Sequence, residues 1–104
     1  MTFADFMRSA QDDPAPPAGL GRALQALWLD RRDQWPEAHA LAQAAGEDAA
    51  ERLAGAWVHA YLHRKEGDPG NAAYWYRQAG QPEAPGALAA EWEQITRTLL
   101  QTGA

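Results

Sequence analysis

The sequence has no cysteine, few basic side chains and no long apolar run, and each absence excludes a class of protein. Without cysteine there is no disulfide, no thiolate metal site and no cysteine nucleophile, which fits a reducing compartment. Nine Lys and Arg against 14 Asp and Glu give a net charge of −5, so the chain lacks the basic footprint of a protein that binds nucleic acid or anionic lipid.

The apolar residues are also too dispersed for a membrane protein, because a membrane span needs roughly 20 of them in succession. The first ten residues, MTFADFMRSA, lack the charged start and the apolar stretch of a secretory signal. We therefore expect a cytoplasmic protein without nucleic-acid or membrane partners.

The residues that are present predict one folded domain over 1–104. A hydrophobic content of 46% with five Trp is too high for a disordered chain, and this length supports a single compact core. Three prolines in QDDPAPPA, residues 11–18, forbid a helix there. This segment is predicted to be a linker that lays a short N-terminal helix, residues 1–10 with Thr2 as its cap, against the main body.

Apolar spacing predicts helices in the rest of the chain, and no segment alternates as a strand does. One helix starts at about residue 19, and others are expected over 36–45, 47–66, 69–79 and 87–101. Gly46, Gly67 and Gly80 follow three of them as C-terminal caps, and Asp68 precedes a first-turn proline. The predicted fold class is therefore all-α.

The helical region repeats itself. WLDRR, starting at Trp28, and YLHRK, starting at Tyr61, lie 33 positions apart. At this offset the apolar stripe of the helix that starts at about residue 19 reappears in the helix over 47–66. Its matched pairs are Leu20 with Leu53, Leu24 with Trp57, Leu27 with Ala60 and Arg31 with Arg64. One more residue in the next turn makes the offset 34, which is the period of a helical repeat.

Residues 35–45 (WPEAHALAQAA) and 68–79 (DPGNAAYWYRQA) carry an alanine three residues after the turn and another seven residues later. Over residues 20–80 this pattern resembles the tetratricopeptide repeat family, although the first-helix Trp, Leu-Gly and Tyr positions of that family are not cleanly matched. The resemblance implies two helix-turn-helix hairpins over 19–80, with the helix 87–101 capping the stack. GDPGNAAYWYRQAG is also similar to a segment of short uncharacterised bacterial proteins, a likeness that implies no activity.

Two of the three histidines, His59 and His63, have i, i+4 spacing, so both can face one ion from a helix. Such a site needs a further ligand. The candidates are Glu66, Asp68 and His39.

The repeat argues against this metal site. It aligns His59 with Ala26 and His63 with Asp30, positions beside the apolar stripe. We therefore favour the interpretation that the two histidines lie on a solvated or half-buried helix flank. The prediction is no metal and no cofactor; if a metal does bind, His59 and His63 hold it.

Three consecutive aromatic residues, Tyr74 to Tyr76, fan out by about 100° each on a helix and cannot all face one core. Trp75 and Tyr76 are expected inside, and Tyr74 outside. Arg64 ends an apolar stripe at the last turn of its helix, where a cation is favourable, and it is also a candidate anion clamp. The candidate binding residues are Tyr61, Arg64, Tyr74 and His63.

The sequence contains no nucleophile–base arrangement and no phosphate loop, so we expect no enzyme. A stack of helical hairpins presents a concave face that binds peptide or protein segments. The predicted function is a small interaction or scaffold module; the alternative is a domain that binds a metal or small ligand on the His59/His63 face. A homodimer through Phe3, Phe6 and Tyr74 is a further hypothesis.

Overall fold

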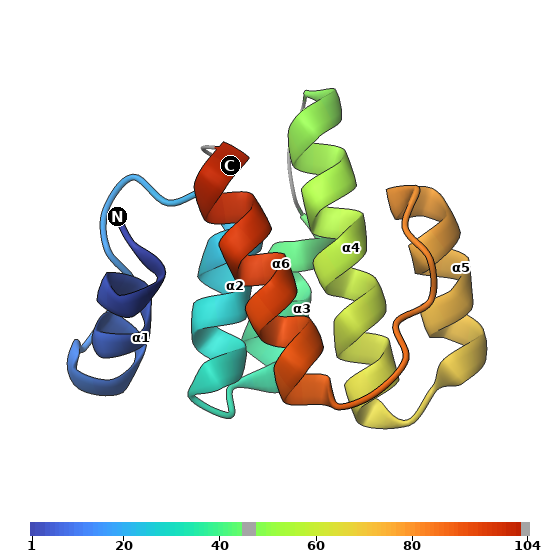
Figure 1. Ribbon diagram of the computed structural model, residues 1–104, viewed down its shortest axis with the longest axis horizontal. Helices are drawn as coiled ribbons and strands as arrows, with labels where there is room; N and C mark the ends of the chain where they lie inside the picture. Colours follow the sequence, from blue (N-terminus) through green and yellow to red (C-terminus); the bar gives the residue numbers. More distant parts are fainter. Residues whose placement is uncertain (45–47, 103–104) are drawn as a thin grey trace.

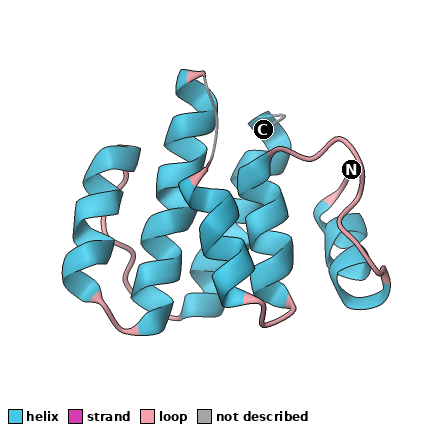
Figure 2. Ribbon diagram, turned by 180° about the vertical axis from the view of Figure 1, so that it is seen from behind, coloured by secondary structure: helices cyan, strands magenta, loops and turns pink. Residues whose placement is uncertain are grey.

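The computed structural model describes residues 1–44 and 48–102, which form six helices and no strand (Figures 1 and 2). The helices are α1 (Phe3–Asp12), α2 (Arg22–Arg31), α3 (Trp35–Gln43), α4 (Ala49–Glu66), α5 (Pro69–Ala79) and α6 (Leu88–Thr102). The predicted all-α class is confirmed for these residues. The cap predicted at Gly46 lies outside the described residues.

The helix ends follow the capping chemistry of the sequence. Thr2 accepts a hydrogen bond from the backbone N–H of Asp5 at 3.0 Å, and the Asp5 carboxylate accepts one from the backbone N–H of Thr2 at 3.1 Å, a reciprocal capping box. Gly67 and Gly80 take φ values of 87° and 68° after α4 and α5, a left-handed conformation that favours glycine. The predicted cap of α1 at Thr2 and the predicted ends of α4 and α5 are therefore confirmed, whereas the predicted end of α1 at residue 10 is wrong: the helix continues to Asp12, ahead of the first proline.

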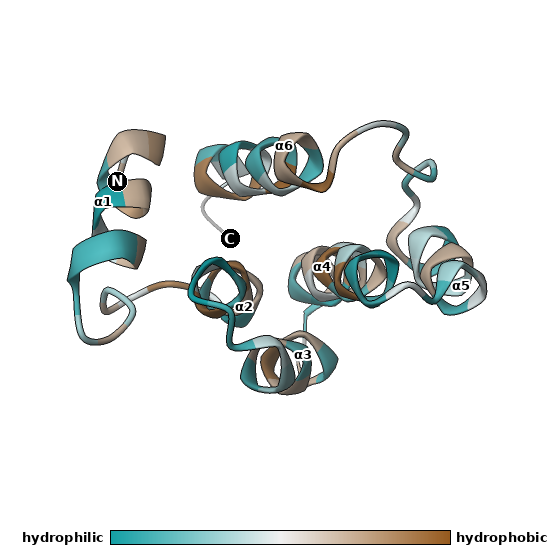
Figure 3. Cartoon of the chain, turned by 90° about the horizontal axis from the view of Figure 1, so that it is seen from below, coloured by the Kyte–Doolittle hydropathy of each residue, from teal (hydrophilic) through white to brown (hydrophobic). Residues whose placement is uncertain are grey.

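Helix α4 is the central element of the molecule. It packs against α2, α3, α5 and α6, and Figure 3 shows these helices around it. Every residue from Ala54 to His63 is buried, so this helix has no solvent face along that stretch. A helix buried on all sides belongs to the interior of the core.

The first turns of α4 project beyond the neighbouring helices (Figure 1). Leu53, which the stripe placed in the core, is 49% exposed there. That prediction is wrong because no helix of the described residues covers this part of α4. Tyr74 is 46% exposed and Tyr76 is buried, as predicted.

Helix α1 lies against α2 and α6, as the predicted linker requires. Phe6 is fully buried beside Trp92, with ring centroids 5.9 Å apart. The Trp28 indole N–H donates to the Ser9 hydroxyl at 3.1 Å, and the Arg32 guanidinium donates to two backbone carbonyls of the α1 end. Because Phe6 is inside, a homodimer contact cannot use it, and that part of the dimer hypothesis is wrong.

Across the described residues, each helix is too short or too polar to serve as a membrane span.

Candidate metal centre

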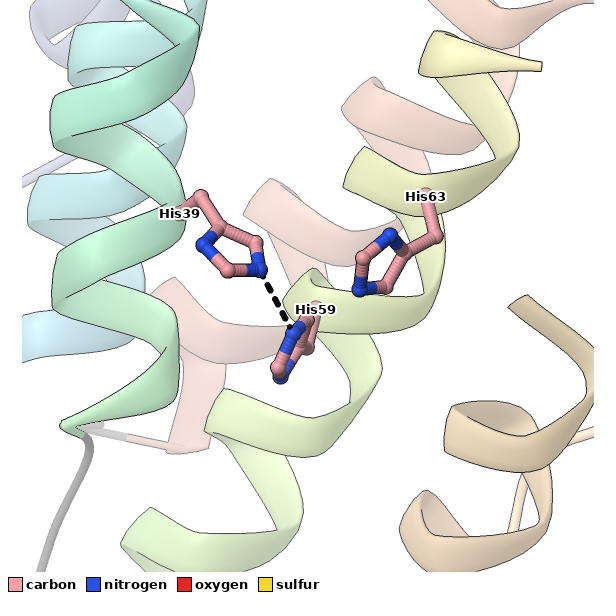
Figure 4. Close-up of side chains that lie close together, drawn as sticks. All are labelled: His39, His59 and His63. Atoms are coloured by element: carbon pink, nitrogen blue, oxygen red, sulfur yellow. Dashed lines mark hydrogen bonds between the residues drawn. The ribbon is translucent and has the colours of Figure 1, made fainter. Parts of the chain in front are cut away.

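The three histidines of the chain meet where α3 packs against α4 (Figure 4). His39 comes from α3, and His59 and His63 come from adjacent turns of α4. One ring nitrogen of each residue lies within 4.8 Å of the others. The closest pair is Nε2 of His39 and Nε2 of His59, which are 2.9 Å apart in a hydrogen bond.

The structure corrects the expected position of the two α4 histidines. His59 is 3% exposed and His63 is 7% exposed, so neither lies on a solvated or half-buried flank. Helix α3 covers one side of α4 and α5 covers another, which places positions beside the apolar stripe inside the core as well. Asp30, the residue aligned with His63 in the repeat, is likewise buried at 2% exposure.

Two tryptophans hold the imidazole rings of the cluster in place. Trp35 stacks on His39 with ring centroids 4.9 Å apart and planes 13° apart, and its indole N–H donates to the Leu62 carbonyl at 3.0 Å. Trp75 stacks on His59 with ring centroids 4.0 Å apart and planes 19° apart. This packing restricts the orientations that the His39 and His59 rings can take.

Glu66 sets the orientation of His63. Its carboxylate lies 3.2 Å from Nδ1 of His63. A carboxylate only accepts, so it places the imidazole proton on Nδ1 and leaves Nε2 as the lone-pair nitrogen. Figure 4 shows the His63 ring directed toward His39 and His59. A carboxylate behind a histidine is the usual outer partner of a metal ligand.

The cluster is electrostatically suited to neutral imidazoles. Burial first, and then the neighbouring His39 and His63, lower the pKa of His59 to about 4. Burial and His63 also lower the pKa of His39, against a smaller opposing effect of Glu66. Both rings therefore remain neutral near pH 7, and the neutral imidazole is the form that binds metals.

The nitrogen separations suit a transition-metal ion. Zinc–nitrogen bonds of about 2.0–2.1 Å place two ligand nitrogens roughly 3.3 Å apart in a tetrahedral site. The separations here start at 2.9 Å and stay within 4.8 Å, so small ring rotations bring all three nitrogens to bonding distance once the Nε2 proton of the His39–His59 hydrogen bond has moved to Nδ1 of its ring. Glu66 and Asp68 form a second group with His63, but the Asp68 carboxylate already caps α5 by accepting from the N–H of Asn71.

Tyr61 and Arg64, two of the predicted binding residues, contact buried carboxylates. The Tyr61 hydroxyl donates to Asp30 at 2.9 Å, and Lys65 donates to the same carboxylate at 2.8 Å. Arg64 donates to Glu91 at 2.9 Å. Of the four predicted residues, His63 belongs to the cluster and Tyr74 lies on the surface.

Sequence reasoning missed the roles of Trp35 and Trp75 beside the histidines. Trp35 precedes His39 by four residues, and this i, i+4 spacing is the signal that predicts their contact on one helix face. The sequence has no comparable signal for Trp75, because its contact with His59 joins two different helices.

Comparison with protein-family models, curated proteins and solved structures finds no match to this chain.

Proposed function

We propose that this protein binds a divalent transition-metal ion through His39, His59 and His63. The convergence of all three histidines of the chain carries the proposal. They come from two helices and lie up to 24 residues apart in the sequence, yet their ring nitrogens gather in one small volume beside an orienting carboxylate.

The ligand set selects the class of ion. Imidazole nitrogen suits Zn²⁺, Cu²⁺, Ni²⁺ and iron, whereas Mg²⁺ and Ca²⁺ require oxygen ligands. The absence of cysteine leaves no thiolate to favour a softer ion. Zn²⁺ is therefore the appropriate first probe, with Mg²⁺ as the ion that should not bind.

A bound ion would join α3 to α4. In this proposal α2–α3 and α4–α5 are two repeat-like hairpins, α6 caps them, and the ion fastens one hairpin to the other. Support comes from the packing of α2 on α3 and of α4 on α5, and from the position of the cluster between α3 and α4.

Titration with Zn²⁺ is expected to give a dissociation constant in the micromolar range or tighter. At a free ion concentration of one hundred times that constant, the folded state gains about 2.7 kcal/mol. We expect His59→Gln to abolish binding and Glu66→Gln to weaken it by about 10- to 100-fold, since Glu66 acts on a ligand rather than on the ion.

Isothermal titration calorimetry measures the affinity, and thermal melts with and without Zn²⁺ measure the stabilisation. Glu93→Gln is the matched control for Glu66→Gln, because Glu93 is exposed on α6 and pairs with Arg97. Millimolar binding, or binding that His39→Gln and His59→Gln leave unchanged, contradicts the proposal.

A second candidate function is an interaction module. A cavity of about 660 Å³, lined by Leu20, Leu53, Trp57 and Leu99 among others, favours it, because Leu53 presents an exposed apolar side chain there. A protein that co-purifies with the chain is expected to be lost from Leu53→Lys and retained by Tyr74→Lys. Equal retention by both variants contradicts this function.

A further inference from the structure

Three histidines do not fill all the coordination positions of a transition-metal ion. Among residues 1–44 and 48–102, no further His, Asp or Glu completes the group formed by His39, His59 and His63. Glu66 contacts the Nδ1 atom of His63, away from the nitrogen that faces the other two rings. Zinc sites with three protein ligands keep a fourth position for water or an external ligand, whereas purely structural sites are closed by four.

A cavity of about 460 Å³ adjoins the cluster and includes His59 in its wall. Its other walls come from the C-terminal half of α3, the first half of α4, and α5, which contributes Trp75. Because His59 belongs to both the cluster and the cavity, a molecule in the cavity lies beside a ligand of the ion. The volume is within the range of small-molecule sites.

The chemistry of the cavity wall favours an anion with an apolar body. Arg52 contributes a guanidinium, and Gln43 and Gln78 contribute amides. Arginine has five N–H donors, so it can contact an anion while it keeps another partner. No described lining residue is acidic, although the chain as a whole carries a charge of −5. The apolar part of the wall consists of Ala42, Ala49, Leu53, Ala56 and Trp75.

We propose that the ion bound by the three histidines takes a small organic carboxylate as its external ligand, and that the cavity beside His59 holds the apolar part of this molecule. One carboxylate oxygen replaces the water on the ion, and no covalent bond within the ligand changes. This inference rests on the proposed metal function, and it adds the ligand class and the location of the ligand.

The protein loaded with Co²⁺ tests the inference, because the visible absorption of Co²⁺ reports its coordination number and ligands. Butyrate is expected to change these bands at concentrations about tenfold lower than acetate, since its two additional CH₂ groups leave water and enter the cavity. Neutral butyramide is expected to leave the bands unchanged.

Gln78→Trp fills the cavity from the exposed side of α5 and should remove the preference for butyrate while it keeps the Co²⁺ bands. Gln94→Trp, the same substitution at an exposed position on α6 outside this cavity, should behave as the unmodified protein. Co²⁺ bands that do not respond to carboxylates, or an equal butyrate preference in Gln78→Trp, overturn this inference alone. Absence of Co²⁺ bands in the unmodified protein overturns the metal function as well.

Discussion

Acidification from pH 6.5 to pH 4 is expected to lower the free energy of unfolding of the metal-free protein by on the order of 3 kcal/mol through His59. Burial, together with the neighbouring His39 and His63, lowers the pKa of this residue from 6.5 to about 4. Between these values the unfolded chain binds a proton at His59 that the folded chain does not bind, so stability falls as the pH falls. Each pKa unit corresponds to about 1.4 kcal/mol.

The loss of stability caused by His59 is confined to a defined pH range. It is absent above pH 6.5, where His59 is neutral in both states, and it is complete once the pH has passed below the folded-state pKa. The lowered pKa of His39 acts in the same direction. The titratable groups beside His59 are His39 and His63, and a positive charge on either ring opposes protonation of His59.

Urea unfolding at several pH values between 7 and 4, with a chelator present, measures this loss. His59→Gln is the matched variant, because it keeps a polar side chain of similar length that does not titrate in this window. Its stability should vary much less with pH, while the carboxylates contribute equally to both proteins. Parallel pH profiles of the two proteins contradict the prediction.

Replacement of Asp30 by alanine is expected to lower the free energy of unfolding by about 3 kcal/mol, near the low end of the cost of breaking a buried ion pair. The Asp30 carboxylate is 2% exposed and accepts from Tyr61 and Lys65. Its loss leaves the buried Tyr61 hydroxyl without this acceptor. The Lys65 side chain is 33% exposed, so water partly replaces its lost partner.

Glu93→Ala is the control for this variant, since it breaks an exposed pair with Arg97 that is worth about 0.3–0.5 kcal/mol. Asp30→Asn keeps an acceptor for Tyr61, so its loss of unfolding free energy should lie between those of Asp30→Ala and Glu93→Ala. This variant keeps the test informative if Asp30→Ala does not fold. Urea unfolding curves with equal slopes give the comparison. A cost for Asp30→Ala no larger than that for Glu93→Ala contradicts the prediction.

The helix ends with a capping residue could be predicted from the sequence because capping is a local property. Thr2, Asp68 and the glycines at 67 and 80 set their helix ends through backbone conformation and hydrogen bonds to residues a few positions away. These interactions depend little on the rest of the fold. They are therefore visible in a single sequence.

The burial of α4 could not be predicted in the same way. An apolar stripe assumes a helix with one face on the core and one in water, but α4 is surrounded and is buried throughout from Ala54 to His63. The polar side chains beside the stripe were therefore assigned to solvent, whereas His59 lies inside. Leu53 is exposed for the complementary reason, because α4 extends past its neighbours at that end.

The histidine cluster could likewise be predicted only in part. The i, i+4 spacing of His59 and His63 is a property of one helix, and the sequence revealed it. The position of His39 depends on the packing of α3 against α4, which no spacing along the chain encodes. His39 therefore remained one of several candidates for a third ligand until the packing of the helices was known.

The stacking of Trp35 on His39 and of Trp75 on His59 gives the protein an internal optical reporter. Two of its five indoles are in direct contact with rings that would bind the ion. A paramagnetic ion such as Cu²⁺ at that distance quenches tryptophan fluorescence, whereas Zn²⁺ has a filled d shell and does not quench in this way. The emission of the unlabelled chain can therefore distinguish which ion occupies the cluster.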